Sequence, residues 1–138
     1  MYFYIEPEVS GGFGDNSVID TTVHPPKVYK LHYQFDGWLG DELLESFPCF
    51  IISEALAQEL EREHLSGFTL EDVEVTKSEQ FEELYPRKAL PKFFWLQVKG
   101  SAARDDLGVA EDHRLVVSES ALNTLRKGKI EEADIEEF

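Results

Sequence analysis

Two stretches of the sequence repeat the same pattern: FIISEALAQEL runs from Phe50 to Leu60, and LVVSESALNTL runs from Leu115 to Leu125. Each begins with an apolar triplet, continues with Ser-Glu, and ends in residues whose leucines recur at helical spacing. Ser53 and Ser118 are suited to accept a hydrogen bond from the first turn of a helix, and the glutamate that follows each serine interacts favourably with the positive end of the helix dipole. Both stretches therefore predict a buried strand that leads directly into a short amphipathic helix.

An acidic strand is expected after each helix. FTLEDVEVT follows the first helix at Phe68–Thr76, and ADIEEF ends the chain at Ala133–Phe138. Such a unit cannot bury the apolar face of its helix alone and needs a shared sheet. We therefore expect a single α+β domain over residues 1–138, with an antiparallel-rich sheet and two similar strand–helix–strand units at about residues 50–75 and 115–138. Ser-Glu after a buried strand is also a common way to begin a helix, so the pattern fits both a duplication and a coincidence of capping.

Other segments predict further strands joined by polar loops. Val28–Phe35 alternates, with Tyr29 on its apolar face and His32 on its polar face, which is typical of a half-buried strand. Lys92–Gly100 is apolar on both faces, so we expect a central strand in which Trp95 is buried. Polar loops, with at most a short helix in the second, are expected at Ser10–Ser17, Asp36–Pro48 and Ser101–His113.

The charge balance is strongly acidic. Twenty-eight Asp and Glu residues against thirteen Lys and Arg residues give a net charge of −15 and an isoelectric point near 4.5. Binding to nucleic acid and to an anionic membrane surface both depend on basic residues, so this charge argues against both. The same charge favours solubility and attracts a basic partner.

The chain has little that suggests secretion or catalysis. Cys49 is the single cysteine, so no internal disulfide can form, and its apolar neighbours predict a buried side chain and not a nucleophile. The opening MYFYIEPEVS lacks the basic start of a signal peptide, and no apolar run reaches the ~20 residues of a membrane-spanning helix. We therefore expect a cytoplasmic protein. No catalytic or cofactor-binding motif is present, and no cofactor is expected.

Acidic residues are concentrated in two segments. RDDLGVAEDH contains Asp105, Asp106, Glu111, Asp112 and His113, whose carboxylates would suit a hard cation or an acid–base pair. Their spacing does not match an EF-hand loop, so a solvated acidic loop is the simpler interpretation. Charges in the tail IEEADIEEF would protect a sheet edge from aggregation or form a landing surface for a basic protein. The acids of the tail are Glu131, Glu132, Asp134, Glu136 and Glu137.

The chain resembles a group of small bacterial proteins. The resemblance lies in PCFIISEALAQELEREHLSGFTLEDVEV, a later DDLG, and the closing HRLVVSESALNTLRKGKIEEADIEEF. These segments resemble the immunity proteins of polymorphic and contact-dependent toxin systems, especially the myxobacterial-type immunity family. The resemblance covers about the last hundred residues, from Trp38 onward, and rests on core and capping positions. It implies a protein that binds a cognate toxin domain and blocks it without catalysis.

We therefore predict an acidic surface that binds a basic toxin. Trp38 lies in a turn between Gly37 and Gly40, where an exposed indole would provide an interface hot spot. Two alternatives stay open: an acidic adaptor without a toxin partner, and a metal-dependent hydrolase that uses the segment Asp105–His113. The predicted contact residues are Trp38, Asp105, Asp106, Glu111, Asp112, Glu131, Glu132, Asp134, Glu136 and Glu137.

Overall fold

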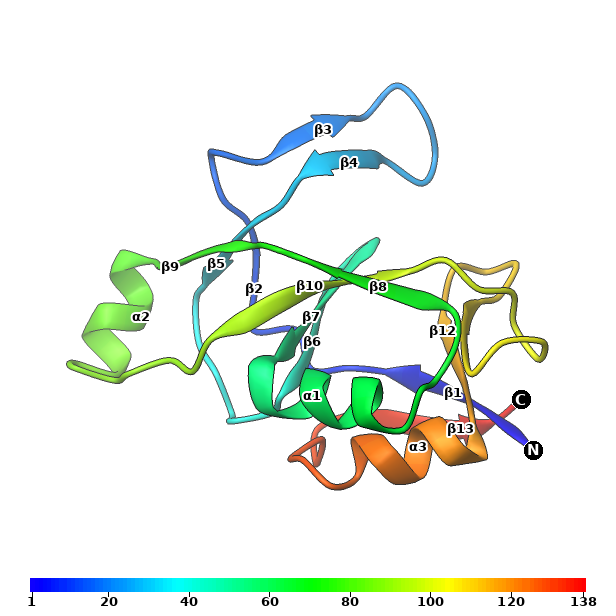
Figure 1. Ribbon diagram of the computed structural model, residues 1–138. Coiled ribbons are helices and arrows are strands. Elements are labelled where there is room, and N and C mark those ends of the chain that lie inside the picture. The colour runs from blue at the N-terminus through cyan, green and yellow to red at the C-terminus, as the bar shows by residue number, and fades with distance from the viewer.

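Two four-stranded antiparallel sheets form the centre of the molecule (Figure 1). The computed structural model describes all residues from Met1 to Phe138. In spatial order, the first sheet contains β6 (Leu43–Ser46), β7 (Cys49–Ser53), β10 (Phe93–Val98) and β8 (Phe68–Glu71). The second sheet contains, in the same way, β11 (Leu107–Val109), β12 (Leu115–Ser118), β1 (Tyr2–Glu6) and β13 (Asp134–Glu137). The strand predicted within Lys92–Gly100 is confirmed as a central one, because β10 lies between β7 and β8.

Each sheet consists of one strand–strand–helix–strand unit and one additional strand. The first unit runs through β6, β7, α1 (Glu54–Arg62) and β8, and the second runs through β11, β12, α3 (Glu119–Leu125) and β13. The additional strand lies between the second and last strands of its unit, and it is β10 in the first sheet and β1 in the second. The two repeated stretches thus occupy equivalent places. The expected small α+β fold with two similar units is confirmed.

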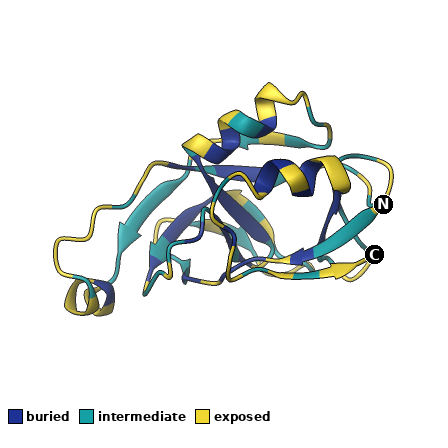
Figure 2. Ribbon diagram, turned by 90° about the horizontal axis from the view of Figure 1, so that it is seen from below, coloured by how far each residue is buried: buried dark blue, intermediate teal, exposed yellow.

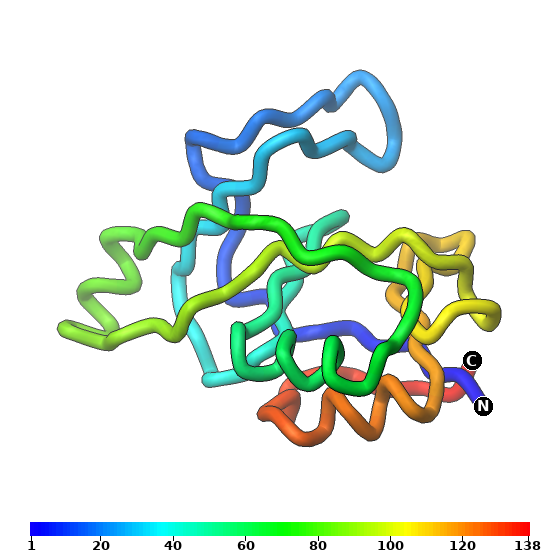
Figure 3. The backbone as a smooth tube through the Cα atoms, in the orientation of Figure 1, coloured from blue at the N-terminus to red at the C-terminus, as the bar shows by residue number.

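The two additional strands differ in their position along the chain relative to their units. β10 follows its unit, whereas β1 precedes its unit by most of the chain, as the backbone trace in Figure 3 makes visible. This arrangement places both chain ends at one edge of the second sheet. There β1 pairs with β13, and the backbone N–H of Phe138 donates to the carbonyl oxygen of Tyr2 at 2.9 Å.

The two sheets are joined around one shared core. Single parallel bridges connect Glu8 with Leu44 and Ser101 with Val109. Helices α1 and α3 pack against each other, and their buried leucines belong to a cluster that also contains residues of both sheets. Burial of one leucine stabilises a fold by about 1.5–3 kcal/mol relative to an exposed leucine, so the periodic leucines of the repeated stretches account for the position of both helices. These leucines are Leu56, Leu60, Leu122 and Leu125.

A carboxylate at the start of the first unit connects it to the second. The hydroxyl of Ser53 caps α1 by accepting a hydrogen bond from the backbone N–H of Leu56 at 3.2 Å, as predicted. The same hydroxyl donates to Glu42 Oε1 at 2.8 Å. The second carboxylate oxygen of Glu42 accepts the backbone N–H of Lys129, just after α3, at 2.6 Å.

Asp106 makes the equivalent contacts at the start of the second unit. Ser118 caps α3 through the backbone N–H of Ala121 at 3.0 Å, as predicted, and donates to Asp106 Oδ1 at 2.8 Å. Asp106 Oδ2 accepts the backbone N–H of Ser66, which follows α1, at 2.9 Å. Each carboxylate therefore joins the first turn of its own helix to the segment that follows the other helix.

A second layer covers the outer face of the first sheet. It contains a sheet in the order β2 (Gly11–Phe13), β5 (His32–Phe35) and β9 (Glu74–Lys77), a hairpin of β3 (Val18–Asp20) and β4 (Lys27–Lys30), and helix α2 (Glu79–Leu84). Tyr33, Phe35 and Phe81 of this layer form a buried cluster with Phe93 and Trp95 of β10. The expected burial of Trp95 is confirmed, since its side chain is 8% exposed. No helix of the structure is long and apolar enough to span a bilayer.

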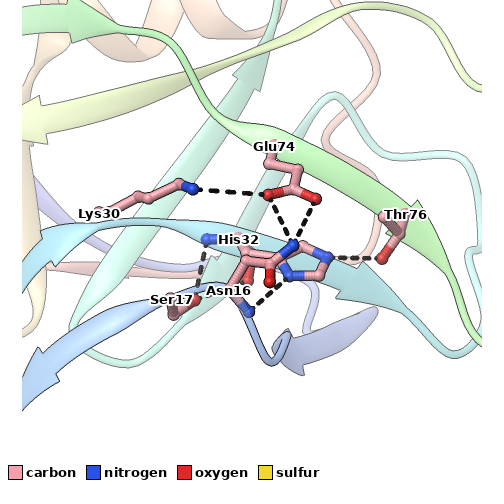
Figure 4. A network of polar contacts seen from close by, with 6 residues as sticks. All are labelled: Asn16, Ser17, Lys30, His32, Glu74 and Thr76. Atoms are coloured by element: carbon pink, nitrogen blue, oxygen red, sulfur yellow. Dashed lines mark hydrogen bonds and ion pairs between the residues drawn. The ribbon is translucent and has the colours of Figure 1, made fainter.

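The single strand predicted at Val28–Phe35 is two strands in different sheets. β4 pairs only with β3, whereas β5 pairs with β2 in the antiparallel and with β9 in the parallel sense. His32, which the alternation places on a polar face, is buried: its Nε2 lies 2.6 Å from Thr76 Oγ1, and its Nδ1 accepts the backbone N–H of Asn16 at 3.2 Å (Figure 4). Tyr29, predicted on the apolar face, is 58% exposed. The alternation of apolar and polar residues in Val28–Phe35 correctly indicates extended backbone. It contains no signal that the two halves of this segment pair with different strands.

The three predicted loops each contain a short strand. One of these strands pairs with β5, about twenty residues further along the chain, whereas the other two form hairpins with the strands that directly follow them, β7 and β12. A Cβ at Gly11 would lie 1.9 Å from the carbonyl oxygen of Gln34, so this glycine permits close pairing of β2 with β5 and does not serve a turn. The predicted strand Phe68–Thr76 is similarly divided between β8 and β9, which belong to different sheets. The strands within the predicted loops Ser10–Ser17, Asp36–Pro48 and Ser101–His113 are β2, β6 and β11, respectively.

We predict that Asp106→Ala and Glu42→Ala each lower the free energy of unfolding by about 1–3 kcal/mol, because each substitution removes charge-assisted hydrogen bonds to a helix cap and to the opposite unit. Urea denaturation measures the change. Glu61→Ala, at an exposed position on α1, is the control.

A double-mutant cycle between Asp106→Ala and Ser118→Ala should reveal a coupling of about 0.5–3 kcal/mol, because the two side chains are directly bonded. Additive effects, or a loss for Asp106→Ala equal to that of Glu61→Ala, would contradict a connecting role for this carboxylate.

Candidate partner-binding surface

The outer face of the second sheet is the candidate surface. Side chains alternate along a strand, so Phe3 and Ile5 of β1 point to the shared core while Tyr4 and Glu6 point away from it. Tyr4 lies opposite Glu136 in the register of β1 and β13. Figure 2 shows these two strands at the chain ends mainly in the colours of intermediate and exposed residues. The outer face thus combines aromatic and acidic side chains in the open.

Arg114 occupies the middle of this face. Its guanidinium carbon lies 3.7 Å from the centroid of the Tyr4 ring, a close cation–π contact. Its Nε donates to Asp112 Oδ2 at 2.7 Å, and one terminal nitrogen lies 3.6 Å from Glu136 Oε2. The Tyr4 ring also packs against Phe138, with centroids 5.0 Å apart. One arginine therefore contacts two acids and an aromatic ring.

The charges of this cluster reinforce one another. Hydrogen bonds from the backbone N–H and then from the guanidinium of Arg114 lower the pKa of Asp112 below its usual value. The side-chain hydrogen bond to Asp112 in turn raises the pKa of Arg114, and the negative charge of Glu6 adds to this effect. Both groups consequently stay ionised at neutral pH.

A hollow of about 550 Å³ adjoins the Tyr4 ring. In protein interfaces, the residues that contribute most of the binding free energy are often arginine and aromatic residues near the centre, surrounded by a polar rim. The arrangement suits docking of another protein surface, in which an incoming side chain enters the hollow and its neighbours meet the acids. The residues that line the hollow are Tyr4, Ala102, Val109, Ala110, Glu111, Asp112 and Phe138.

The symmetry of the fold explains why this surface is open. Trp95 lies between Ile51 and Glu71 in the first sheet, as Tyr4 lies between Val116 and Glu136 in the second. The second layer buries the Trp95 face of the first sheet. The Tyr4 face of the second sheet is covered only in part: Val116 on β12 is fully buried, whereas Tyr4 on β1 is half-buried and Glu136 on β13 is exposed. The second sheet therefore leaves open the β1–β13 part of the face that a second layer buries in the first sheet.

The structure brings together only part of the predicted acidic surface. Glu111, Asp112, Asp134 and Glu136 lie around the Arg114 cluster, Asp134 because it pairs with Glu6 on the same face. Glu137 points to the opposite side of β13, since it is opposite Phe3. The expectation of one continuous face that includes every acid of both segments is thus wrong, because neighbouring residues of a strand point in opposite directions.

The other predicted acids have internal contacts or lie elsewhere. Asp106 connects the two units, and Asp105 accepts the backbone N–H of Ser101 at 2.9 Å within its own turn. Glu131 and Glu132 are exposed in the turn after α3, where the backbone N–H of Glu132 donates to a carboxylate oxygen of Asp41 at 2.8 Å. The metal-dependent hydrolase alternative requires the side chains of Asp105–His113 to converge on an ion. The structure contains no group of three or more His, Cys, Asp or Glu side chains that could hold a metal ion.

Trp38 lies apart from the acidic surface and belongs to the second buried cluster. Its indole N–H donates to the carbonyl oxygen of Asp41 at 2.9 Å, and its ring packs edge-on against Phe35 and Phe93. The ammonium nitrogen of Lys88 lies over the Trp38 ring, 5.5 Å from its centroid. The expected exposed indole is therefore half-buried, and its contacts hold the loop before β6.

Sequence reasoning missed the residues at the centre of the surface: Tyr4, Arg114 and Phe138. A signal for Tyr4 exists, because YFYIE places Tyr2, Tyr4 and Glu6 on one face of a strand whose other face is apolar. No local signal identifies Arg114, since its partners on β1 and β13 are distant in the sequence.

Three further carboxylates are shielded from solvent. Asp41 is fully buried with one carboxylate oxygen unpaired, and burial, followed by the charge of Glu8, raises its pKa. Glu8 itself accepts the backbone N–H groups of Leu39 at 2.8 Å and Asp41 at 3.3 Å. These two acids anchor the loop before β6. The third is Glu45, whose pKa is raised to about 7, first by burial and then by the charge of Glu6.

Comparisons with protein-family models, curated proteins and solved structures found no match to this chain.

Glu45→Gln should stabilise the protein at pH 8 but not at pH 4. The folded carboxyl keeps its proton up to about pH 7, whereas the unfolded one loses it near 4.5, so the folded state binds more protons between these values and its stability falls as the pH rises through them. After allowance for partial solvent screening, we expect a gain on the order of 1–2 kcal/mol at pH 8.

Urea denaturation at the two pH values measures this gain, with Glu61→Gln as the exposed control. An equal effect of Glu45→Gln at pH 4 and pH 8 would rule out ionisation as its cause.

Proposed function

We propose that this protein is a cytoplasmic immunity protein that binds a cognate bacterial toxin domain and blocks it with the outer face of its second sheet. The observation that carries the proposal is the Arg114 cluster, in which Tyr4 and Phe138 are framed by carboxylates on the open, β1–β13 part of a sheet face. The resemblance of the repeated stretches to immunity proteins supports the choice of a toxin as the partner.

The proposed mechanism is occlusion, without a chemical step. A partner that covers the Tyr4 ring and fills the adjoining hollow removes apolar surface from water at the centre of the interface. The acids around this centre then face basic groups of the toxin. Toxins that act on nucleic acids are basic because their substrate is rich in phosphate, and an acidic protein can cover that same surface.

Charge supports rapid capture of the toxin. With a net charge of −15, the protein attracts a basic partner over a long range, and charge complementarity can raise association rates to ~10⁸–10⁹ M⁻¹s⁻¹ at low salt. Exposed acids at the rim, such as Asp134 and Glu136, should therefore govern association. Tyr4 and Arg114, at the centre, should govern dissociation.

We predict that Asp134→Lys/Glu136→Lys slows association with the toxin encoded beside this chain's gene by about tenfold at low salt, because it reverses the charge of the proposed rim. Glu79→Lys/Glu82→Lys on α2 changes the net charge equally at a distant site and is the matched control. Surface plasmon resonance at two salt concentrations measures both pairs, and growth of cells that co-express the toxin measures protection.

Tyr4→Ala should raise the dissociation rate of the same complex by about tenfold or more, because an aromatic residue at an interface centre contributes ~2 kcal/mol or more. Thermal denaturation establishes that the variant is folded. Absence of a complex with the wild-type protein ends the immunity proposal. Equal losses for the rim pair and the α2 pair leave binding intact but refute this surface as its site.

A further inference from the structure

A cleft lies between the β3–β4 hairpin and the end of the first sheet. Its volume is about 450 Å³, within the range of roughly 300–1,000 Å³ that is typical of small-molecule sites. The hairpin contributes Pro26 and Val28, and the body of the protein contributes Trp95, Val98 and Val109. The walls of this cleft are therefore largely apolar.

The charge of the cleft is opposite to that of the whole protein. Its lining contains Lys27 and Lys99 and no acidic residue, although acids outnumber bases by 28 to 13 in the chain. Both lysines are exposed, and neither forms one of the ion pairs of the protein. Asp20 is opposite Lys27 in the hairpin register but does not line the cleft. The Lys27 ammonium lies 5.2 Å from the centroid of the exposed Tyr29 ring, and neither lysine has an ion-pair partner, so both can pair with an incoming anion.

Ring contacts hold the hairpin against the body, and the inner wall of the cleft is uncharged. The ring of His24 at the hairpin turn lies 6.3 Å from that of Phe47 and 5.8 Å from that of His113, which holds the hairpin close to the body. Cys49 lines the cleft, and burial raises the pKa of its thiol to about 12, so the thiol is neutral. A preformed site loses little free energy to reorganisation on binding.

We propose that this cleft binds a small amphiphilic carboxylate. The apolar part of the ligand would lie along Trp95 and Val28, and its carboxylate would meet Lys27 and Lys99 at the rim. An aliphatic or aromatic acid of about eight to ten carbon atoms suits a cleft of this volume. The cleft adjoins the hollow beside Tyr4, because Val109 lines both, but ligand binding in the cleft does not depend on toxin binding, so either proposal can fail without the other.

Octanoate, octanol and octylamine are matched probes, because they share a chain length and differ in charge. In a Trp38→Phe background, Trp95 is the sole indole and its fluorescence reports on the cleft. We expect octanoate to bind about tenfold more tightly than octylamine. A protein of net charge −15 attracts cations in general, so preference for the anion can only come from a local site.

Lys27→Gln/Lys99→Gln should weaken octanoate binding by about tenfold and leave octanol binding unchanged, because only the carboxylate loses a partner. Lys30→Gln/Lys92→Gln removes the same charge at exposed positions outside the cleft and should have little effect. The proposal is overturned if octanoate causes no change in Trp95 fluorescence, if the three probes bind equally, or if the two lysine pairs weaken octanoate binding to the same extent.

Discussion

The fold depends on two carboxylates that each satisfy a helix cap and a backbone N–H of the opposite unit. Glu42 binds Ser53 and the segment after α3, and Asp106 binds Ser118 and the segment after α1. A serine hydroxyl alone fixes where its helix begins. The carboxylate behind it also binds the segment that follows the other helix, so the relative position of α1 and α3 is defined by directional bonds in addition to apolar packing. The shared core packs around the two helices in that relative position.

The two sheets share a topology but have different surroundings. The first sheet carries a second layer, and its outer face is accordingly apolar, with Trp95 and Ile51 buried. At the equivalent positions the second sheet has Tyr4, which retains a hydroxyl and a half-exposed ring, and the fully buried Val116. Cys49, the first residue of β7, corresponds to Arg114, which directly precedes β12 and contacts two acids. Tyr4 in place of Trp95 and Arg114 in place of Cys49 make this part of the second sheet more polar, which suits a face in contact with water.

The sequence predicts those features that local interactions determine. The serine caps and the buried leucines of α1 and α3 follow from hydrogen bonds and periodicity within one helix, and the structure contains them as expected. The division of Val28–Phe35 into β4 and β5 arises because β5 pairs with the distant strands β2 and β9, and the local sequence contains no signal for it. The same limit applies to the surface: Asp106 and Asp112 look alike in the sequence, yet one holds the fold together and the other faces solvent beside Arg114. Only the tertiary partner distinguishes them.

The adjacency of the chain ends has a consequence for engineering. Because β1 and β13 are hydrogen-bonded neighbours, a short linker could fuse Phe138 to Met1 while new ends are opened in the exposed turn around Ala103. In the resulting circular permutant, β1 would follow β13 as β10 follows β8, and the chain would read as two tandem halves of equal order. Such a molecule could be divided between its halves, which makes this fold a natural scaffold for a split reporter whose fragments reassemble through Glu42 and Asp106.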